Sequence, residues 1–197
     1  MVCLKEFSME FIEKDVIKVD RELSDLDLFT LDFVKILKKY FKYVIISGYV
    51  AIVFGRARGS EDVDIIVGFI DFSKFEEFLS EIKKSDFYCI NSDDSSEIYD
   101  YAKETAARFA KEGTVIPNIE LKFARKEPDF IALDKVIKIK LGSEEILTSC
   151  LELQIAFKEV VLKSPKDMED AKHLRNVFKD NLDFSLIKKY EVMLNGI

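Results

Sequence analysis

Hydrophobic and polar positions along the chain follow several different periods, which predicts helices and strands in alternation. Residues 9–20 are predicted to form a peripheral strand or hairpin, and alternation over residues 119–123 predicts a strand with one buried face. Apolar residues at helical spacing predict amphipathic helices, and short apolar runs predict strands. We expect these helices at 24–40 and 71–84, and these strands at 43–46, 62–67, 87–90 and 136–140. The fold class is therefore α/β or α+β, with a mixed β-sheet flanked by helices.

The second half of the chain is predicted to be more helical. Residues 91–113 start with serine and acidic residues and end at a glycine, which predicts a single capped helix. Residues 144–162 predict a long helix, and the serine, proline and acid within 164–167 are typical of a second helix start. These patterns divide the chain into a core of residues 1–142, including an N-terminal extension, and a C-terminal helical segment of residues 143–197.

The stretch from residue 47 to residue 67 combines a glycine turn, two arginines and two acids. Ser47 and Gly48 directly follow a predicted strand and precede a short predicted helix. Glycine lets the backbone approach a ligand closely, and free N–H groups at a helix start favour a phosphate. Ser47 and Gly48 are therefore candidate phosphate-binding residues. Arg56 and Arg58 follow, and guanidinium groups match phosphate oxygens, although either arginine could instead form a structural ion pair.

Asp62 and Asp64 lie two positions apart on a predicted strand, so their side chains project from the same face. Two adjacent carboxylates repel each other unless a hard cation lies between them. Mg²⁺ is the natural candidate, because it takes oxygen ligands and is commonly held by one or two carboxylates with substrate phosphates. The alternative interpretation of the isolated pair is a solvated strand end.

In this order, the features resemble the nucleotidyltransferase superfamily of the DNA polymerase β type, especially its small prokaryotic and archaeal members, some of which are toxins of toxin–antitoxin systems. The resemblance covers about residues 40–70, and Tyr49 stands where the family usually has a small residue. It implies a nucleotidyltransferase-like sheet and Mg²⁺ binding by Asp62 and Asp64. The nucleotide-binding residues that it implies are Ser47, Gly48, Arg56, Arg58 and Ser60.

The family also has a third carboxylate on a later strand. Glu120 lies on the opposite face from the apolar residues of its strand, which makes it the best match to this carboxylate. The resemblance then implies that Glu120 is the third catalytic and metal-binding residue. Asp129 and Asp134, in a more irregular stretch, are the alternates, and an ordinary exposed glutamate is the other interpretation of Glu120. A lysine followed by paired aspartates in the C-terminal segment is a further resemblance, which makes Lys158 a candidate phosphate ligand, although an ordinary surface lysine is the favoured interpretation of this residue.

The implied activity is Mg²⁺-dependent transfer of a nucleoside monophosphate from an NTP to a hydroxyl of RNA, a protein or a small molecule, with release of pyrophosphate. The alternative is a non-catalytic protein of the same fold that binds a nucleotide or a partner, such as a toxin–antitoxin component. A protein partner or a homo-oligomer is compatible with both.

The composition of the chain excludes several kinds of binding, chemistry and location. A net charge of −7 argues against nucleic-acid binding over the whole surface, and the single histidine, His173, excludes chemistry that needs several. Three widely spaced cysteines fit reduced thiols better than disulfides or a zinc site. Because the chain has neither a long apolar run nor a signal-peptide pattern, we expect a cytoplasmic protein that does not enter the membrane.

Overall fold

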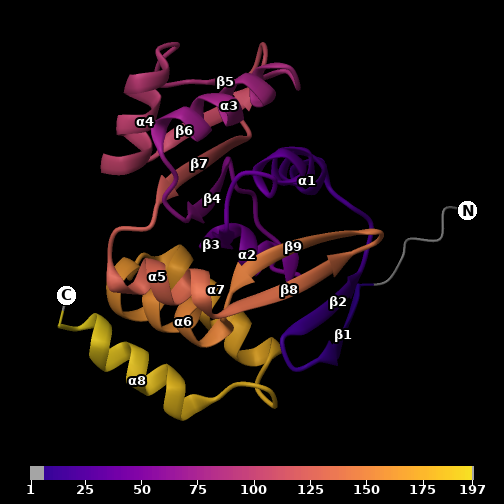
Figure 1. The fold of residues 1–197 in the computed structure, drawn as a ribbon. Coiled ribbons are helices and arrows are strands. Elements are labelled where there is room, and N and C mark those ends of the chain that lie inside the picture. Colours follow the sequence, from indigo (N-terminus) through magenta and orange to yellow (C-terminus); the bar gives the residue numbers. More distant parts are fainter. Residues whose placement is uncertain (1–6, 197) are drawn as a thin grey trace, which may run out of the picture.

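The computed structural model describes residues 7–196, which form one mixed sheet of nine strands with helices packed against it (Figure 1). The strands are β1 (Ser8–Glu13), β2 (Val16–Asp20), β3 (Tyr43–Ile46), β4 (Asp62–Val67), β5 (Phe87–Cys89), β6 (Ala107–Lys111), β7 (Asn118–Phe123), β8 (Val136–Leu141) and β9 (Glu144–Ser149). The helices are α1 (Asp25–Leu37), α2 (Gly48–Val53), α3 (Phe72–Lys83), α4 (Ser95–Glu104), α5 (Glu127–Asp134), α6 (Leu151–Phe157), α7 (Pro165–Val177) and α8 (Phe184–Leu194). A π-helical turn, η1 (Lys158–Leu162), continues α6 directly. The predicted mixed sheet flanked by helices is confirmed.

The strand order is β1-β2-β8-β9-β3-β4-β7-β6-β5, so β4 lies near the middle of the sheet. It pairs antiparallel with β3 and parallel with β7. Strand β6 then pairs antiparallel with β7. Residues from four different parts of the chain therefore meet around the centre of the sheet.

An aromatic cluster holds α1, α3 and α4 against one face of the sheet. Phe33 of α1 packs against the rings of Phe78, Phe87 and Phe109, with centroid distances between 5.2 and 6.0 Å. On β7, the alternate residues Ile119, Leu121 and Phe123 are buried. Because side chains alternate along a strand, the polar residues between them project from the opposite face. That opposite face carries the candidate site.

The start of α1 is fixed by a buried polar cluster. Ser24 caps the helix, and Asp27 is fully buried, where it accepts hydrogen bonds from Arg21 at 2.6 and 2.8 Å. The hydroxyl of Tyr49 donates to the same carboxylate at 2.7 Å. Tyr49 therefore has a structural explanation at the position where the family usually has a small residue.

The predicted helix over residues 144–162 is wrong in its first part. Residues 144–149 form β9, which pairs antiparallel with β8, and the helix begins only at Leu151. Gly142, with φ of 61°, lies in the turn between the two strands, a conformation that glycine adopts easily. The division proposed after residue 142 would thus fall inside a hairpin of the sheet.

Two other predictions are corrected by the structure. Residues 91–113 contain α4 and then β6, not one helix that ends at Gly113. Asp129 and Asp134 lie in α5, not in an irregular stretch. The remaining predicted elements are confirmed within a few residues at each end, including the helix start at Ser164.

Among residues 7–196, no helix combines the length and the apolar character needed to cross a lipid bilayer. Cys89 is buried and Cys150 is partly buried, and both are free thiols. Cys3 lies outside the described residues.

Candidate functional site

A row of side chains crosses four strands at the centre of the sheet. Asp64 of β4 is in register with Ile46 of β3 on one side and with Glu120 of β7 on the other. Glu120 is in register with Arg108 of β6. Directly opposed residues project from the same face of a sheet, so the row presents two carboxylates between an apolar side chain and a guanidinium group.

Asp62 and Asp64 are both partly buried on this face, with the fully buried Val63 between them turned into the core. Burial, and then the charges of Asp62 and Glu120, raise the pKa of Asp64 to about 6, although the Ser47 hydroxyl and Lys122 oppose the rise. Asp62 accepts a hydrogen bond from Ser60 Oγ at 3.0 Å. The two aspartates fit a divalent cation, because a cation would relieve the repulsion that destabilises the charged form of Asp64.

Glu120 lies beside Asp64, as the sequence predicts, but its carboxylate is already paired. Arg108 NH2 lies 2.5 Å from Glu120 Oε1, and both side chains are partly exposed to solvent. Within residues 7–196, no group of three or more His, Cys, Asp or Glu side chains forms a ready-made metal site. Glu120 thus lies beside Asp64 with its Oε1 held by Arg108.

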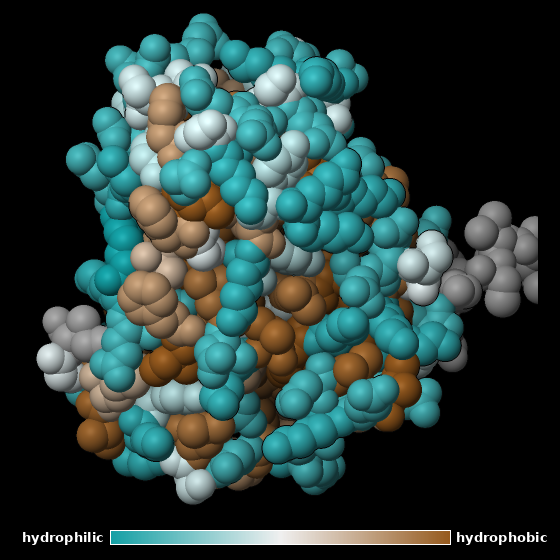
Figure 2. All heavy atoms as spheres, in the orientation of Figure 1, coloured by the Kyte–Doolittle hydropathy of each residue, from teal (hydrophilic) through white to brown (hydrophobic). Residues whose placement is uncertain are grey.

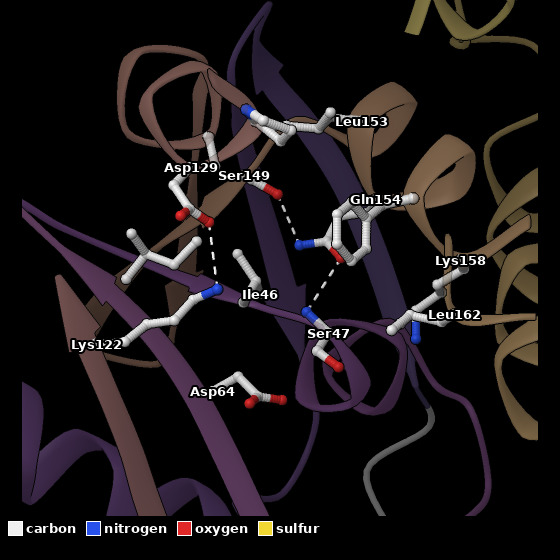
Figure 3. A pocket seen from close by; sticks show the side chains of 14 residues that line it. Ile46, Ser47, Asp64, Lys122, Asp129, Ser149, Leu153, Gln154, Lys158 and Leu162 are labelled. Carbon is white, nitrogen blue, oxygen red and sulfur yellow. Dashed lines mark hydrogen bonds and ion pairs between the residues drawn. The ribbon is translucent and has the colours of Figure 1, made fainter. Parts of the chain in front are cut away.

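The turn between β3 and α2 is held in a strained conformation. Ser47 has φ of 66° and ψ of −134°, which costs a residue other than glycine about 1–3 kcal/mol. Gln154 of α6 stabilises this turn, since its Oε1 accepts from the Ser47 backbone N–H at 3.1 Å and its Nε2 donates to Ser149 Oγ at 2.6 Å (Figure 3). Ser47 and Asp64 lie side by side at the cavity in the same view.

Gly48 lets the Arg58 side chain approach the backbone of this turn closely. A Cβ atom at residue 48 would lie 2.0 Å from Arg58 NH2, so the Arg58 guanidinium rests directly on the Gly48 backbone. The structure thus brings Arg58 next to Gly48, two of the residues predicted from the sequence as candidate nucleotide ligands.

The arginines and Lys158 belong to a charge cluster with α7. Asp170 is fully buried, and its Oδ2 accepts from Arg58 NH2 at 3.1 Å and from Lys158 Nζ at 3.0 Å. Lys158 also donates to Asp167 at 3.0 Å, and Arg56 pairs with Glu169. Lys158 is 1% exposed, so its interpretation as a surface lysine is wrong.

A first cavity of about 290 Å³ lies on the β3 side of Asp64. One wall of this cavity is apolar. On the face shown in Figure 2, hydrophobic side chains gather in the middle, between the β4–β7 region and the C-terminal helices. The apolar wall includes Ile46, Ile66, Ala132, Leu153, Phe157 and Leu162, and the polar lining includes Ser47, Asp64, Lys122, Asp129, Ser149, Gln154 and Lys158.

A second cavity of about 460 Å³ lies on the β6 side of the same carboxylate. It shares Ile46, Asp64 and Lys122 with the first cavity. Its other lining residues are Ile65, Asn91, Thr105, Ala106, Arg108, Glu120 and Arg125. Asp64 is therefore accessible from two sides, one largely apolar and one rich in cations.

Several residues of the site were not predicted from the sequence. Gln154, Arg108 and Arg125 reach it from segments that carry no recognisable motif, and the only signal was that Gln154 is the single glutamine of the chain. His173 makes a structural contact, since its Nε2 donates to the Phe54 carbonyl at 2.9 Å.

Comparison with known proteins supports the fold assignment. No family profile matches the sequence, and no curated protein matches it. Ten chains of solved structures match, including an antigenic nucleotidyltransferase-like protein from Paracoccidioides brasiliensis. That crystal structure superposes with a TM-score of 0.52 at 16% identity, over 87% of this chain and 88% of that chain. The chain therefore has a nucleotidyltransferase-like fold.

Proposed function

We propose that this protein is a Mg²⁺-dependent nucleotidyltransferase that moves a nucleoside monophosphate from an NTP to a hydroxyl group of RNA, a protein or a small molecule. The observation that carries the proposal is the position of Asp64, which lines both cavities at the centre of a nucleotidyltransferase-like sheet, with Asp62 two positions before it on the same strand. A two-substrate transfer needs a site for each substrate, with the charged groups between them.

The first cavity suits the nucleotide. Its apolar wall, with Leu153 and Phe157, suits a nucleobase, and its polar rim, with Ser47 and Lys158, suits phosphates. Arg58 lies on Gly48 at the same rim. Acids of α7 already form ion pairs with Arg56, Arg58 and Lys158. A bound triphosphate would therefore share these three cations with the acids of α7.

The reaction forms a bond between the acceptor oxygen and the α-phosphorus. The bond from the α-phosphorus to the oxygen that bridges to the β-phosphorus breaks, and pyrophosphate leaves with the bonding electrons. We assign Glu120, which is in register with Asp64, as the acceptor of the hydroxyl proton. Mg²⁺ held by Asp62 and Asp64 would supply charge stabilisation for the attacking and leaving oxygens.

The test is incubation of the purified protein with Mg²⁺ and each α-labelled NTP, with and without total RNA. Transfer of label to an acceptor, lost in an Asp62→Ala, Asp64→Ala variant that keeps its melting temperature, would support the proposal. An equal signal from the variant would contradict it.

A second candidate function is nucleotide or partner binding without turnover. It is favoured by one observation, the pairing of Glu120 with Arg108, which leaves the third carboxylate engaged. Glu120→Gln distinguishes the two functions: an enzyme should lose turnover, whereas a binding protein should keep its nucleotide affinity and show no turnover before or after the change.

A further inference from the structure

We propose that the second cavity binds a phosphate group of the acceptor, and that this phosphate draws Arg108 away from Glu120. The inference rests on the proposed function, because it names the class of acceptor that would enter beside Asp64. The acceptor would be a phosphate ester whose hydroxyl lies close to its phosphate.

Three cationic side chains line this cavity. Arg108 and Lys122 each face a carboxylate, Glu120 at 2.5 Å and Asp129 at 3.2 Å. Arg125 is different, because its guanidinium donates to the backbone carbonyls of Glu104 and Thr105 at the end of α4. Two carboxylates, Asp64 and Glu120, line the same cavity, so its lining has three cationic side chains and two acidic ones.

Arg125 is exceptional among the arginines of the chain. The other five each have a carboxylate within ion-pair distance, including Arg21 with Asp27 and Arg175 with Glu159. For Arg125, no such carboxylate is found in the described part of the chain. An unbalanced guanidinium beside a cavity, in a protein of net charge −7, favours an anionic ligand at that place.

The arrangement fits a phosphate better than a lone carboxylate. A phosphate offers several oxygens, and guanidinium groups bind such oxygens in pairs. Arg108 is 53% exposed and its partner Glu120 is 21% exposed, so the ion pair lies at the cavity surface, where a phosphate could compete with it. The released Glu120 carboxylate would then be free to face the acceptor hydroxyl and Asp64. Acceptors without a phosphate would leave Glu120 paired.

Binding of two probes, without NTP or metal, tests the site directly. Glycerol 3-phosphate represents a small phosphate ester, and a short oligoribonucleotide with a free 3′-hydroxyl represents an RNA end. We expect at least one to bind by calorimetry, and Arg108→Ala and Arg125→Ala each to weaken its binding about tenfold or more. Lys138→Ala is the matched control, since Lys138 is a strand cation paired with Glu145 and lies outside both cavities.

Glu120→Gln gives a second, opposite readout. Because it removes the carboxylate that competes for Arg108, it should raise the affinity for the phosphate probe severalfold. A purely structural ion pair would leave that affinity unchanged. The proposal is overturned if neither probe binds, if the two arginine variants bind like the Lys138→Ala control, or if Glu120→Gln does not tighten binding.

Label-transfer assays with the same variants separate this inference from the proposed function. If transfer needs Asp62 and Asp64 but is unaffected by Arg108→Ala, the proposed function stands. The inference that the acceptor carries a phosphate is then overturned. Phosphate binding that depends on Arg108, with no transfer to any acceptor, would refute the proposed function and overturn the acceptor role of the cavity. Transfer to only one of the two probes would support the inference and identify the source of the phosphate.

Discussion

Asp64 lies between Asp62 on its own strand and Glu120 on the next, and its pKa is raised to about 6 chiefly by burial. We expect Asp64→Asn to lower nucleotidyl transfer by at least about 100-fold, because a metal ion contributes several kcal/mol of charge stabilisation to such reactions. The melting temperature without metal should stay the same or rise, since one repelling carboxylate is removed. Transfer and thermal unfolding measured on one preparation test both expectations, and unchanged transfer would refute the role of Asp64.

Ser47 combines a strained backbone with a hydroxyl at the first cavity. We expect Ser47→Gly to raise the free energy of unfolding by up to about 1 kcal/mol, because glycine adopts positive φ without strain. Ser47→Ala keeps the strain and removes the same hydroxyl. If the hydroxyl contacts a phosphate, both variants should raise KM for the NTP by a similar factor, whereas different KM values would point to the backbone instead.

Asp27 gives a prediction about pH and stability. Burial alone would raise its pKa, but hydrogen bonds from Arg21, Ser24 and Tyr49 together lower the pKa below its usual value. A carboxyl group with a lowered folded-state pKa stabilises the protein above the unfolded value of about 3.9, and this stabilisation is lost as the pH falls through the folded value. Urea unfolding between pH 5 and pH 3 should therefore show a smaller loss of stability for Asp27→Asn than for the original protein. An equal loss in both would contradict it.

At the scale of single residues, the sequence predicted the members of the candidate site that lie close together along the chain. Ser47, Gly48, Asp62 and Asp64 fall within one short segment, so a glycine turn and a strand period were enough to group them. The burial of Lys158 was not predictable in the same way. Its partner Asp170 is on the next helix, and only the packing of that helix closes the ion pair.

The loop between α2 and β4 is joined to α7 through Asp170. Since Asp170 is fully buried and pairs with both Arg58 and Lys158, we expect Asp170→Asn to lower the free energy of unfolding by about 3 kcal/mol. Glu169→Gln is the control, because Glu169 is 67% exposed and an exposed ion pair contributes at most about 1 kcal/mol. Urea unfolding measures both, and equal losses would show that the buried pairs do not hold α7 in place.

Helices and strands whose own residues carry a clear cap or an apolar face were predicted well. A segment whose structure depends on a neighbouring strand was not. Helix α3 has a capping aspartate and a clear apolar face, so its ends were found within a residue. The segment 144–149 starts with two acids, which also suits the first turn of a helix. Pairing with β8 makes it a strand instead, because a sheet partner outweighs a weak helical preference.

The complete site exists only at the scale of the whole molecule. Asp64, Glu120 and Arg108 meet because β4, β7 and β6 are neighbours in the sheet, although β5 and two helices separate β4 from β6 along the chain. Strand order of this kind leaves no direct trace in a single sequence. The resemblance to nucleotidyltransferases led to Glu120 as the candidate third carboxylate, but it gave no sign that Arg108 would be the partner of Glu120.

Pyrophosphate release measures the proposed reaction most directly, because it does not require the acceptor to be identified in advance. Each NTP would be incubated with Mg²⁺ and either total RNA or glycerol 3-phosphate. We expect release from at least one NTP, abolished by EDTA and by Asp62→Asn or Asp64→Asn, and retained by Asp134→Asn, whose side chain is 70% exposed. Release that persists in the Asp62 and Asp64 variants, or its absence with every NTP in a folded protein, would contradict the proposed function.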